Sequence, residues 1–275
     1  VRLLEHRNGW HRDTAARLLY QRQDADAVGL LETLARESAL PEGRMTALYA
    51  LAGLDALDAD VLLAELADAS ENVRVHTIRL AESHLGESAI RQKLVSMTDD
   101  PDPQVRYQLA FTLGEVDDPD VRTSALSRLL LKDDADTWMQ FAVLSSLSDR
   151  AGAVFQTLVE QAGAQELEDR SALLMLLARQ IGAANSPDDV AAFGECLDTL
   201  PTHDESIRSE LVRSLLGGES REKQDRILAN AGETTTRVLM ELLVDARGGS
   251  SDENLPDEQR AEAVRSRTDA RAVQQ

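Results

Sequence analysis

The sequence predicts an all-α protein: a right-handed α-solenoid of helix pairs, with about five clear repeats followed by degenerate C-terminal helices. Three observations predict this class. One motif recurs about every 32 residues, no run of β-branched residues alternates as a strand would, and an apolar fraction of 43% contains only 3% aromatic residues. A fixed period of this length is typical of stacked helical repeats, which bury a continuous core between neighbours.

The motif is clearest in residues 99–114, where an acidic turn with two prolines precedes a helix. Pro103 suits the first helical position, where its missing N–H leaves no hydrogen bond unmade. Val105, Leu109 and Leu113 follow at intervals of four residues, so they share one face of that helix. This face is the predicted contact with the neighbouring repeats.

An alignment of the copies sets the period. Taking Arg12, Arg44, Arg74, Arg106 and Met139 as equivalent positions gives spacings of 32, 30, 32 and 33 residues. The same alignment puts Trp138 in the place of Val105 and Trp10 in the related position of the first copy. Core packing is therefore the favoured interpretation of both tryptophans, ahead of a ligand platform.

The helices follow one another in pairs, each after a turn that carries Asp, Pro or Gly. The pattern predicts helices over 9–22, 25–37, 43–54, 58–66, 71–84, 87–97, 103–114, 119–131, 136–147 and 151–162. Beyond residue 163 the repeat degrades, and helices are expected over 171–181, from 187 to about 200, and over 205–216, 221–229 and 235–244.

The same pattern suggests three segments. Residues 1–163 form the repeat array, and residues 164–247 are degenerate helical repeats that continue the solenoid. Residues 248–275 begin with Gly-Gly-Ser-Ser and have a mixed-charge composition, which predicts a linker or a charged tail with a frayed helix near 257–271. The chain starts in helix-like sequence without an initiating Met, so we expect it to be a fragment of a longer protein.

Charge and cysteine content exclude several functions. The net charge of −20, from 49 acidic and 29 basic residues, argues against binding to nucleic acid or to an anionic bilayer. It leaves open a cationic protein surface or a neutral ligand. No apolar run approaches the roughly 20 residues that a membrane span needs. Cys196 is the only cysteine, which excludes an internal disulfide and a multi-cysteine metal site.

The string Asp-x-Asp-x-x-Val-Arg-x-x-Leu-Ala over residues 100–110 resembles the signature of HEAT repeats. The resemblance implies a ladder in which a turn aspartate and a helix arginine fasten neighbouring repeats. By position, the ladder residues would be Asp68, Asp100, Asp133, Arg74 and Arg106, with Arg12 and Arg44 as looser matches. Met139 departs from the pattern, so the ladder is expected to lapse at the fifth repeat. The resemblance gives these residues a structural role.

Residues 8–19, 47–54 and 105–115 resemble the HEAT segment of bacterial PVC-type haem-binding, dehydrogenase-like multidomain proteins. That family places a β-propeller before the repeats and often a CxxCH haem segment after them. The resemblance therefore implies a periplasmic or exported protein, with haem bound, if anywhere, in a flanking domain. Neither flanking domain lies in these 275 residues, so the redox chemistry has no residue here to which it transfers.

Other conspicuous residues have ordinary structural interpretations. Paired turn acids such as Asp100 and Asp102 suit helix caps better than calcium, because the remaining ligands of a calcium loop are missing. The histidines lack the spacing of a metal site, and Cys196 lies in an apolar helix pattern that favours a buried, inert thiol. Trp10, His11 and Arg12 form the best candidate interaction surface, or a junction to a preceding domain.

These observations predict a non-catalytic interaction or scaffold module, with no catalytic, cofactor-binding or metal-binding residue of its own. The expected partner is another protein, or a neighbouring domain of the same polypeptide, and not nucleic acid. One alternative is an accessory segment of a dehydrogenase-like or c-type haem redox protein whose chemistry lies in flanking domains. Another is a HEAT protein of the bilin-lyase type, which only the repeat recommends.

Overall fold

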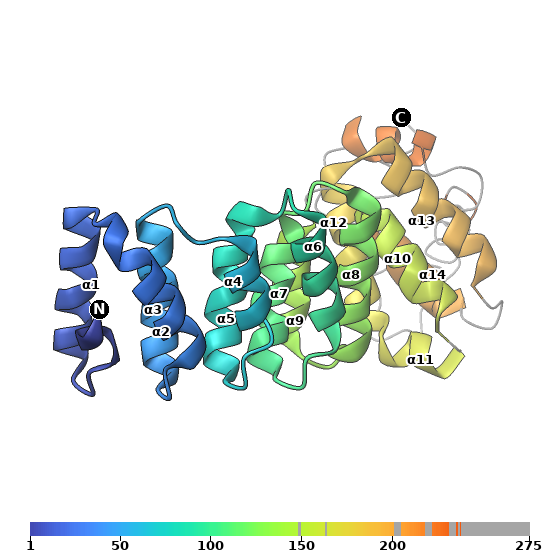
Figure 1. The fold of residues 1–275 in the computed structure, drawn as a ribbon. Coiled ribbons are helices and arrows are strands. Elements are labelled where there is room, and N and C mark those ends of the chain that lie inside the picture. Colours follow the sequence, from blue (N-terminus) through green and yellow to red (C-terminus); the bar gives the residue numbers. More distant parts are fainter. Residues whose placement is uncertain are drawn as a thin grey trace. The chain divides into compact units, whose positions relative to one another are not determined.

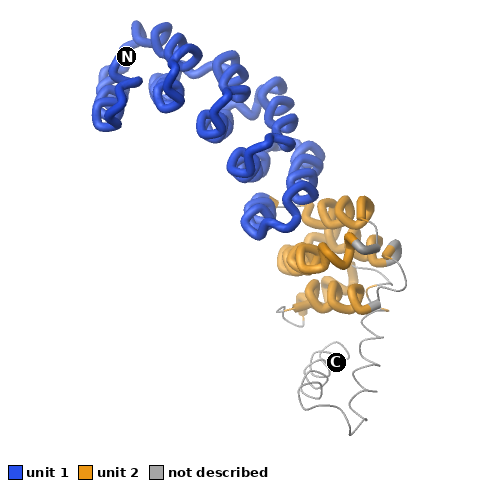
Figure 2. Tube along the Cα trace, turned by 90° about the horizontal axis from the view of Figure 1, so that it is seen from below, with its two compact units in different colours: residues 1–146 blue, residues 147–275 orange. Residues whose placement is uncertain are grey.

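The computed structural model describes residues 1–147, 150–162, 164–200, 205–217 and 222–230, together with residues 235 and 237. Every regular element in those residues is a helix (Figure 1), and the predicted α-solenoid is confirmed. Contacts between residues divide the chain into two units, residues 1–146 and residues 147–275 (Figure 2). The helices predicted near 235–244 and 257–271 and the linker from 248 lie, apart from residues 235 and 237, outside the described residues.

Unit 1 consists of two rows of helices, and consecutive helices of the chain alternate between the rows. Each helix of the first row contacts the next member of that row: α1 (Gly9–Arg22), α3 (Pro41–Gly53), α5 (Glu71–Leu80), α7 (Pro103–Gly114) and α9 (Thr137–Ser146). The second row comprises α2 (Val28–Glu37), α4 (Ala59–Glu65), α6 (Ser88–Ser96) and α8 (Pro119–Lys132). Figure 2 shows that unit 1 curves, with the first row on the inside of the curve. We call these the inner row and the outer row.

Short 3₁₀ turns complete unit 1: η1 (Arg2–Glu5), η2 (Ala25–Ala27), η3 (Ala81–His84) and η4 (Met97–Asp99). Two of them replace the last turn of a predicted α-helix. The helix expected over 71–84 changes to 3₁₀ geometry after Leu80, and the helix expected over 87–97 does so after Ser96. Tightening of this kind is common at helix ends, where the last carbonyls have no partner four residues on.

Acidic residues of the turns start several helices. Asp58 accepts a hydrogen bond from the backbone N–H of Val61, and Asp102 accepts from those of Gln104 and Val105. Such caps pair backbone donors that the helix itself cannot satisfy. Asp118 and Asp136 cap α8 and α9 in the same way. The acidic turns thus have a structural explanation that involves no ion.

The core of unit 1 is aliphatic and lies between the rows. Val105, Leu109 and Leu113 of α7 are fully buried, as the spacing of four residues predicts. Ile90 and Leu94 of α6 are also fully buried. No aromatic side chain contributes to this core, so closely packed Leu, Ile, Val and Ala fill it.

Unit 2 contains α10 (Ala151–Glu160), α11 (Ala164–Asp169), α12 (Ser171–Ala184), α13 (Pro187–Thr199) and α14 (Glu205–Leu216), and residues 222–230 are also helical. Its core includes Phe155 and Phe193, which are fully buried with ring centroids 5.0 Å apart. Helices α12 and α14 approach so closely that a Cβ at Gly182 would overlap the carbonyl oxygen of Leu215. Only glycine fits at this crossing.

The alignment in the fifth repeat is wrong by one residue. Trp138 is 73% exposed, whereas Met139 is buried and occupies the place of Val105. The side chain of Gln140 therefore takes the place of the Arg106 guanidinium. Core packing is also wrong for Trp10, which is 66% exposed on α1, a helix without a single buried residue.

Candidate interaction surface and the aspartate–arginine pairs

Three arginines of the inner row each hold an aspartate of a following turn through two parallel hydrogen bonds. In each pair, Nε and Nη2 of the arginine donate to the two carboxylate oxygens, an arrangement that fixes geometry and charge together. The pairs are Arg44–Asp68 (2.6 and 2.8 Å), Arg74–Asp100 (2.9 and 2.9 Å) and Arg106–Asp133 (2.7 and 2.6 Å). Each pair joins one helix of the inner row to the turn before the next.

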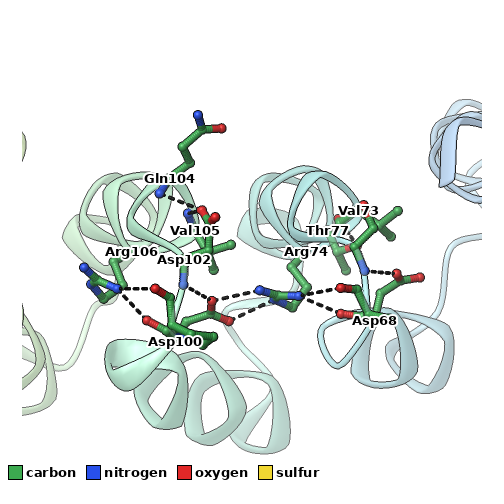
Figure 3. Close-up of polar contacts among 12 residues, drawn as sticks. Asp68, Val73, Arg74, Thr77, Asp100, Asp102, Gln104, Val105 and Arg106 are labelled. Carbon is green, nitrogen blue, oxygen red and sulfur yellow. Dashed lines mark hydrogen bonds and ion pairs between the residues drawn. The ribbon is translucent and has the colours of Figure 1, made fainter.

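The remaining guanidinium nitrogen of each arginine binds its own repeat. Nη1 of Arg74 donates to the carbonyl oxygen of Asp68, six residues earlier, at 2.8 Å, and Nη1 of Arg106 donates to that of Asp100 at 2.6 Å (Figure 3). Asp100 therefore accepts Arg74 on its carboxylate and Arg106 on its main chain. The contacts form an unbroken line from the turn at Ser38, whose carbonyl accepts from Arg44, to Asp133.

The pairs are largely withdrawn from water. The side chains of Arg74 and Asp100 are 12% and 8% exposed. Hydrogen bonding to the aspartates raises the pKa of each paired arginine despite its burial. Burial pushes the pKa of Asp68 upward, but hydrogen bonds from Arg44 and from the N–H of Ser70 outweigh it and lower that pKa. Both partners are thus charged at neutral pH.

A second carboxylate lies beside the first of these pairs. Glu65, the last residue of α4, is buried, and burial together with the neighbouring Asp68 raises the pKa of Glu65 to about 7. Arg44 opposes this shift without cancelling it. Glu65 is consequently the group in this region whose charge changes near neutral pH.

Arg12 contacts no aspartate, which corrects its assignment to the ladder. Its Nη1 donates to the main-chain oxygens of His6 and Arg7 at 2.8 and 3.1 Å, so it keeps the contact six residues back and lacks the carboxylate. Ser38 stands where the other turns have aspartate, and its hydroxyl contacts Glu5 instead. The line of bidentate pairs therefore begins at Arg44.

The line ends at Asp133, in the turn before α9. Gln140 donates from Nε2 to the carbonyl oxygen of Asp134, again six residues back, at 2.6 Å. Its amide makes the carbonyl contact of an arginine without the bidentate carboxylate bond. The tandem acids Asp133 and Asp134 divide between them the two roles that Asp100 performs alone.

Exposed aromatic side chains mark the inner row. All seven Trp, Tyr and Phe residues of unit 1 are at least 37% exposed, and all lie on inner-row helices: Trp10, Tyr20, Tyr49, Tyr107, Phe111, Trp138 and Phe141. The only other exposed large apolar side chains in the described residues are Leu3, Leu18 and Leu30. Apolar area of this extent in one row is typical of an interaction surface.

The register of the repeat explains the exposure of four of these seven residues: Trp10, Tyr49, Phe111 and Trp138. Positions two before and five after each arginine (or Gln140) are exposed in all five inner-row helices: Trp10 and Arg17, Glu42 and Tyr49, Asn72 and Arg79, Gln104 and Phe111, Trp138 and Ser145. A helix face that packs on neither row must carry these positions. The sequence pattern alone does not predict this exposure. The spacing from Arg106 could have identified Phe111, whereas Tyr107 and Phe141 lie one residue after the arginine position, outside this register.

Trp10, His11 and Arg12 lie together at the start of α1. The Trp10 and His11 rings meet edge to face with centroids 5.1 Å apart, and His11 meets His6 in the same way at 4.4 Å. His76 pairs with Tyr49, whose hydroxyl lies 2.9 Å from His76 Nδ1. Burial, with the nearby Arg79 charge, lowers the pKa of His76.

Candidate nucleophiles and metal ligands are few in the part of the chain that the structure describes. Burial, aided by two nearby glutamates, raises the pKa of Cys196 to about 12, so its thiol is not a nucleophile at neutral pH. Within the described ranges, no three His, Cys, Asp or Glu side chains gather as a metal site would require. No helix among those residues is long and apolar enough to cross a membrane.

Comparison with known proteins identifies the repeat. The family model for HEAT repeats matches residues 59–148 and, in an overlapping match, residues 91–178. These residues carry HEAT repeats, as the string at 100–110 predicts. The matches do not extend to the PVC-type architecture. Among curated proteins no sequence match is found.

Two solved structures are similar over nearly the whole chain. One is the C-terminal fragment of the Chaetomium thermophilum cohesin loader SCC2, with 13% identity and a TM-score of 0.38 over 98% of this chain and 26% of the other. The second is an engineered protein, with 17% identity and a TM-score of 0.37 over 99% of this chain and 81% of the other. The chain thus spans about a quarter of the SCC2 fragment.

Proposed function

We propose that this chain is a non-catalytic interaction module whose inner row binds a protein partner, or a neighbouring domain of the same polypeptide. The observation that carries the proposal is the exposure of every aromatic side chain of unit 1 on that one row. Trp, Tyr and Phe contribute large contact areas at low entropic cost and are enriched at protein interfaces. A monomer gains nothing by leaving seven of them in water.

The Asp–Arg pairs support the proposal by explaining how the surface is held. They join each inner-row helix to the turn before the next, and their side chains are largely buried. Because these charges have structural partners, they are poor candidates for acid–base catalysis. The HEAT-repeat match agrees, since stacked repeats expose extended concave surfaces for binding.

The resemblance to PVC-type redox proteins supplies the neighbouring-domain form of the same proposal. In that form the inner row would seat a dehydrogenase-like or haem domain, and the chemistry would belong to that domain. Purified residues 1–275 mixed with haem should then show no Soret band characteristic of axial ligation. A stoichiometric haem spectrum would place a cofactor in this chain and overturn the non-catalytic proposal.

A matched pair of variants tests the interaction module itself. The chain is used as bait, either intact or with Tyr49, Tyr107 and Phe141 each changed to Ser, and captured proteins are quantified by mass spectrometry. A control bait carries Leu30→Ser on the outer row, where Leu30 is 61% exposed. The proposal predicts partners that the triple variant loses and the control keeps. Equal capture by all three baits contradicts it.

A further inference from the structure

A pocket of about 560 Å³ opens at the C-terminal end of α7. It is lined by Glu82, Ser83, Leu85, Gly86, Phe111, Glu115 and Asp117, so three carboxylates and one aromatic ring surround it without a basic side chain. The three carboxylates are exposed. The C-terminal carbonyls of α7 add a further negative potential, because the helix dipole places its negative end there.

A chain of side-chain hydrogen bonds beside the pocket connects η3, α7 and α5. Glu82 Oε1 accepts a hydrogen bond of 2.8 Å from the hydroxyl of Thr112. Thr112 also accepts from Gln108, which in turn accepts from Arg79 at 2.9 Å. Arg79 is thereby engaged outside the pocket lining. The carboxylate of Glu82 thus stays oriented while the other two acids remain free of charged partners in the lining.

Further exposed aromatic side chains lie on α7 and on the neighbouring α9. Phe111 lines the pocket and also meets Tyr107 edge to face, with centroids 5.1 Å apart. Helix α9 packs against α7 and carries Phe141, 52% exposed, in the register position of Tyr107, and Trp138, 73% exposed, one turn earlier. We call Tyr107, Phe111, Trp138 and Phe141 the α7–α9 patch.

We propose that the acidic pocket and the α7–α9 patch together bind a peptide segment of the partner that combines a Lys or Arg side chain with adjacent large apolar side chains. The proposal rests on the interaction module proposed above and specifies its partner. The cation enters the pocket, where three carboxylates attract it and Phe111 offers a ring face. The apolar side chains cover the patch. A net charge of −20 strengthens the attraction for cationic segments and disfavours a second copy of the chain.

The test begins without an assumed sequence. A phage library of random dodecapeptides is selected on the immobilised full chain, and the most enriched peptide is synthesised with a fluorescein label. The proposal predicts that enriched sequences combine Lys or Arg with Leu, Ile, Phe, Met or Trp. The Kd of the labelled peptide, measured by fluorescence polarisation, should increase at least fivefold between 50 and 500 mM NaCl, because salt screens exposed charges.

Variants then locate the site. Phe141→Ser, Trp138→Ser and the double change Glu115→Gln/Asp117→Asn each remove exposed side chains and should weaken binding at least tenfold without changing the circular dichroism melt. Leu30→Ser and Glu37→Gln, matched changes at exposed positions of α2 on the outer row, should leave Kd within twofold. Sedimentation velocity of the free chain should show a monomer.

Each other result has a definite meaning. A peptide whose binding ignores the α7–α9 and pocket variants overturns the assigned site but leaves the interaction module standing. Enrichment of acidic or purely polar peptides overturns the assigned partner chemistry. A dimer that Trp138→Ser dissociates makes a second copy the occupant of the patch and also overturns the proposal. If the selection enriches no peptide, both the site and the interaction module fail.

Discussion

The Arg74–Asp100 pair gives a quantitative test of how the repeats are fastened. Arg74→Met keeps most of the side-chain volume but leaves the Asp100 carboxylate, 8% exposed, without its cation, and the Asp68 carbonyl without its donor. Breaking a buried ion pair by removing one partner costs about 3–5 kcal/mol. Because both side chains keep some exposure, and the N–H of Asp102 still donates to Asp100, we expect the lower end, about 3 kcal/mol.

A double-mutant cycle isolates the pair from its surroundings. Arg74→Met, Asp100→Asn and the double variant are unfolded with urea, followed by circular dichroism at pH 7, with hydrogen exchange of α5 and α7 as a local readout. We expect the double variant to be less destabilised than the sum of the single variants, with a coupling energy of about 2 kcal/mol. The exchange protection of both helices should fall together, since a repeat array loses stability at the affected interface.

The chain contains its own control for this cycle. Arg128 and Asp99 form an ion pair of 2.6 Å, as short as the ladder pairs, but their side chains are 47% and 66% exposed. Exposed pairs contribute only about 0–1 kcal/mol. The Arg128→Met/Asp99→Asn cycle should therefore give a coupling energy below about 1 kcal/mol. Equal coupling energies in the two cycles would refute the argument that burial makes the Arg74–Asp100 pair a fastening.

Three further predictions concern other buried groups. Burial raises the folded pKa of Glu65 to about 7, so the stability that Glu65 contributes is present below about pH 4.5 and is lost as pH rises through 7. Glu65→Gln should therefore raise the free energy of unfolding at pH 8 by up to about 3 kcal/mol and make the urea midpoint less dependent on pH between about pH 4.5 and 7. An unchanged dependence of the midpoint on pH would count against this reasoning. Gly182→Ala should destabilise the chain by about 2–3 kcal/mol, because the new Cβ overlaps the main chain of α14. Gly29→Ala on α2, where a Cβ meets open space, should stabilise the chain by about 0.5–1 kcal/mol. Thermal melts that rank the two variants the other way would contradict the packing argument. The Cys196 thiol should resist Ellman's reagent in the folded chain and react promptly in 6 M urea, and fast reaction without denaturant would disprove its burial.

The repeat and its paired charges were accessible to sequence reasoning because their geometry is local. In two repeats an arginine follows a turn aspartate by six residues and donates to the main-chain carbonyl of that aspartate, so Arg74 and Arg106 could be placed by counting. Counting failed where the turn changes. The tandem acids Asp133 and Asp134 add one residue between the carboxylate and the carbonyl that the next side chain contacts, and Gln140 replaces the expected Met139.

The exposed aromatic side chains of the inner row could not be predicted for a different reason. An aromatic residue at helical spacing carries the same sequence signal whether its side chain packs on a neighbour or faces water, so the sequence predicts core positions for Trp10 and Trp138, which are exposed. Exposure is decided by the packing of both rows, which depends on contacts between residues about 30 positions apart. The pocket beside Phe111 is equally non-local, because η3 and the end of α7 supply its acids together.

The most direct test of the proposed binding surface uses the two tryptophans, both of which are exposed on the inner row. In the Trp10→Phe chain, Trp138 is the only emitter, and titration with the selected peptide should shift its emission to the blue and reduce its quenching by acrylamide. In the Trp138→Phe chain, the emission of Trp10 should stay constant over the same titration. Peptide binding that leaves Trp138 unchanged and as open to acrylamide as before would contradict the account.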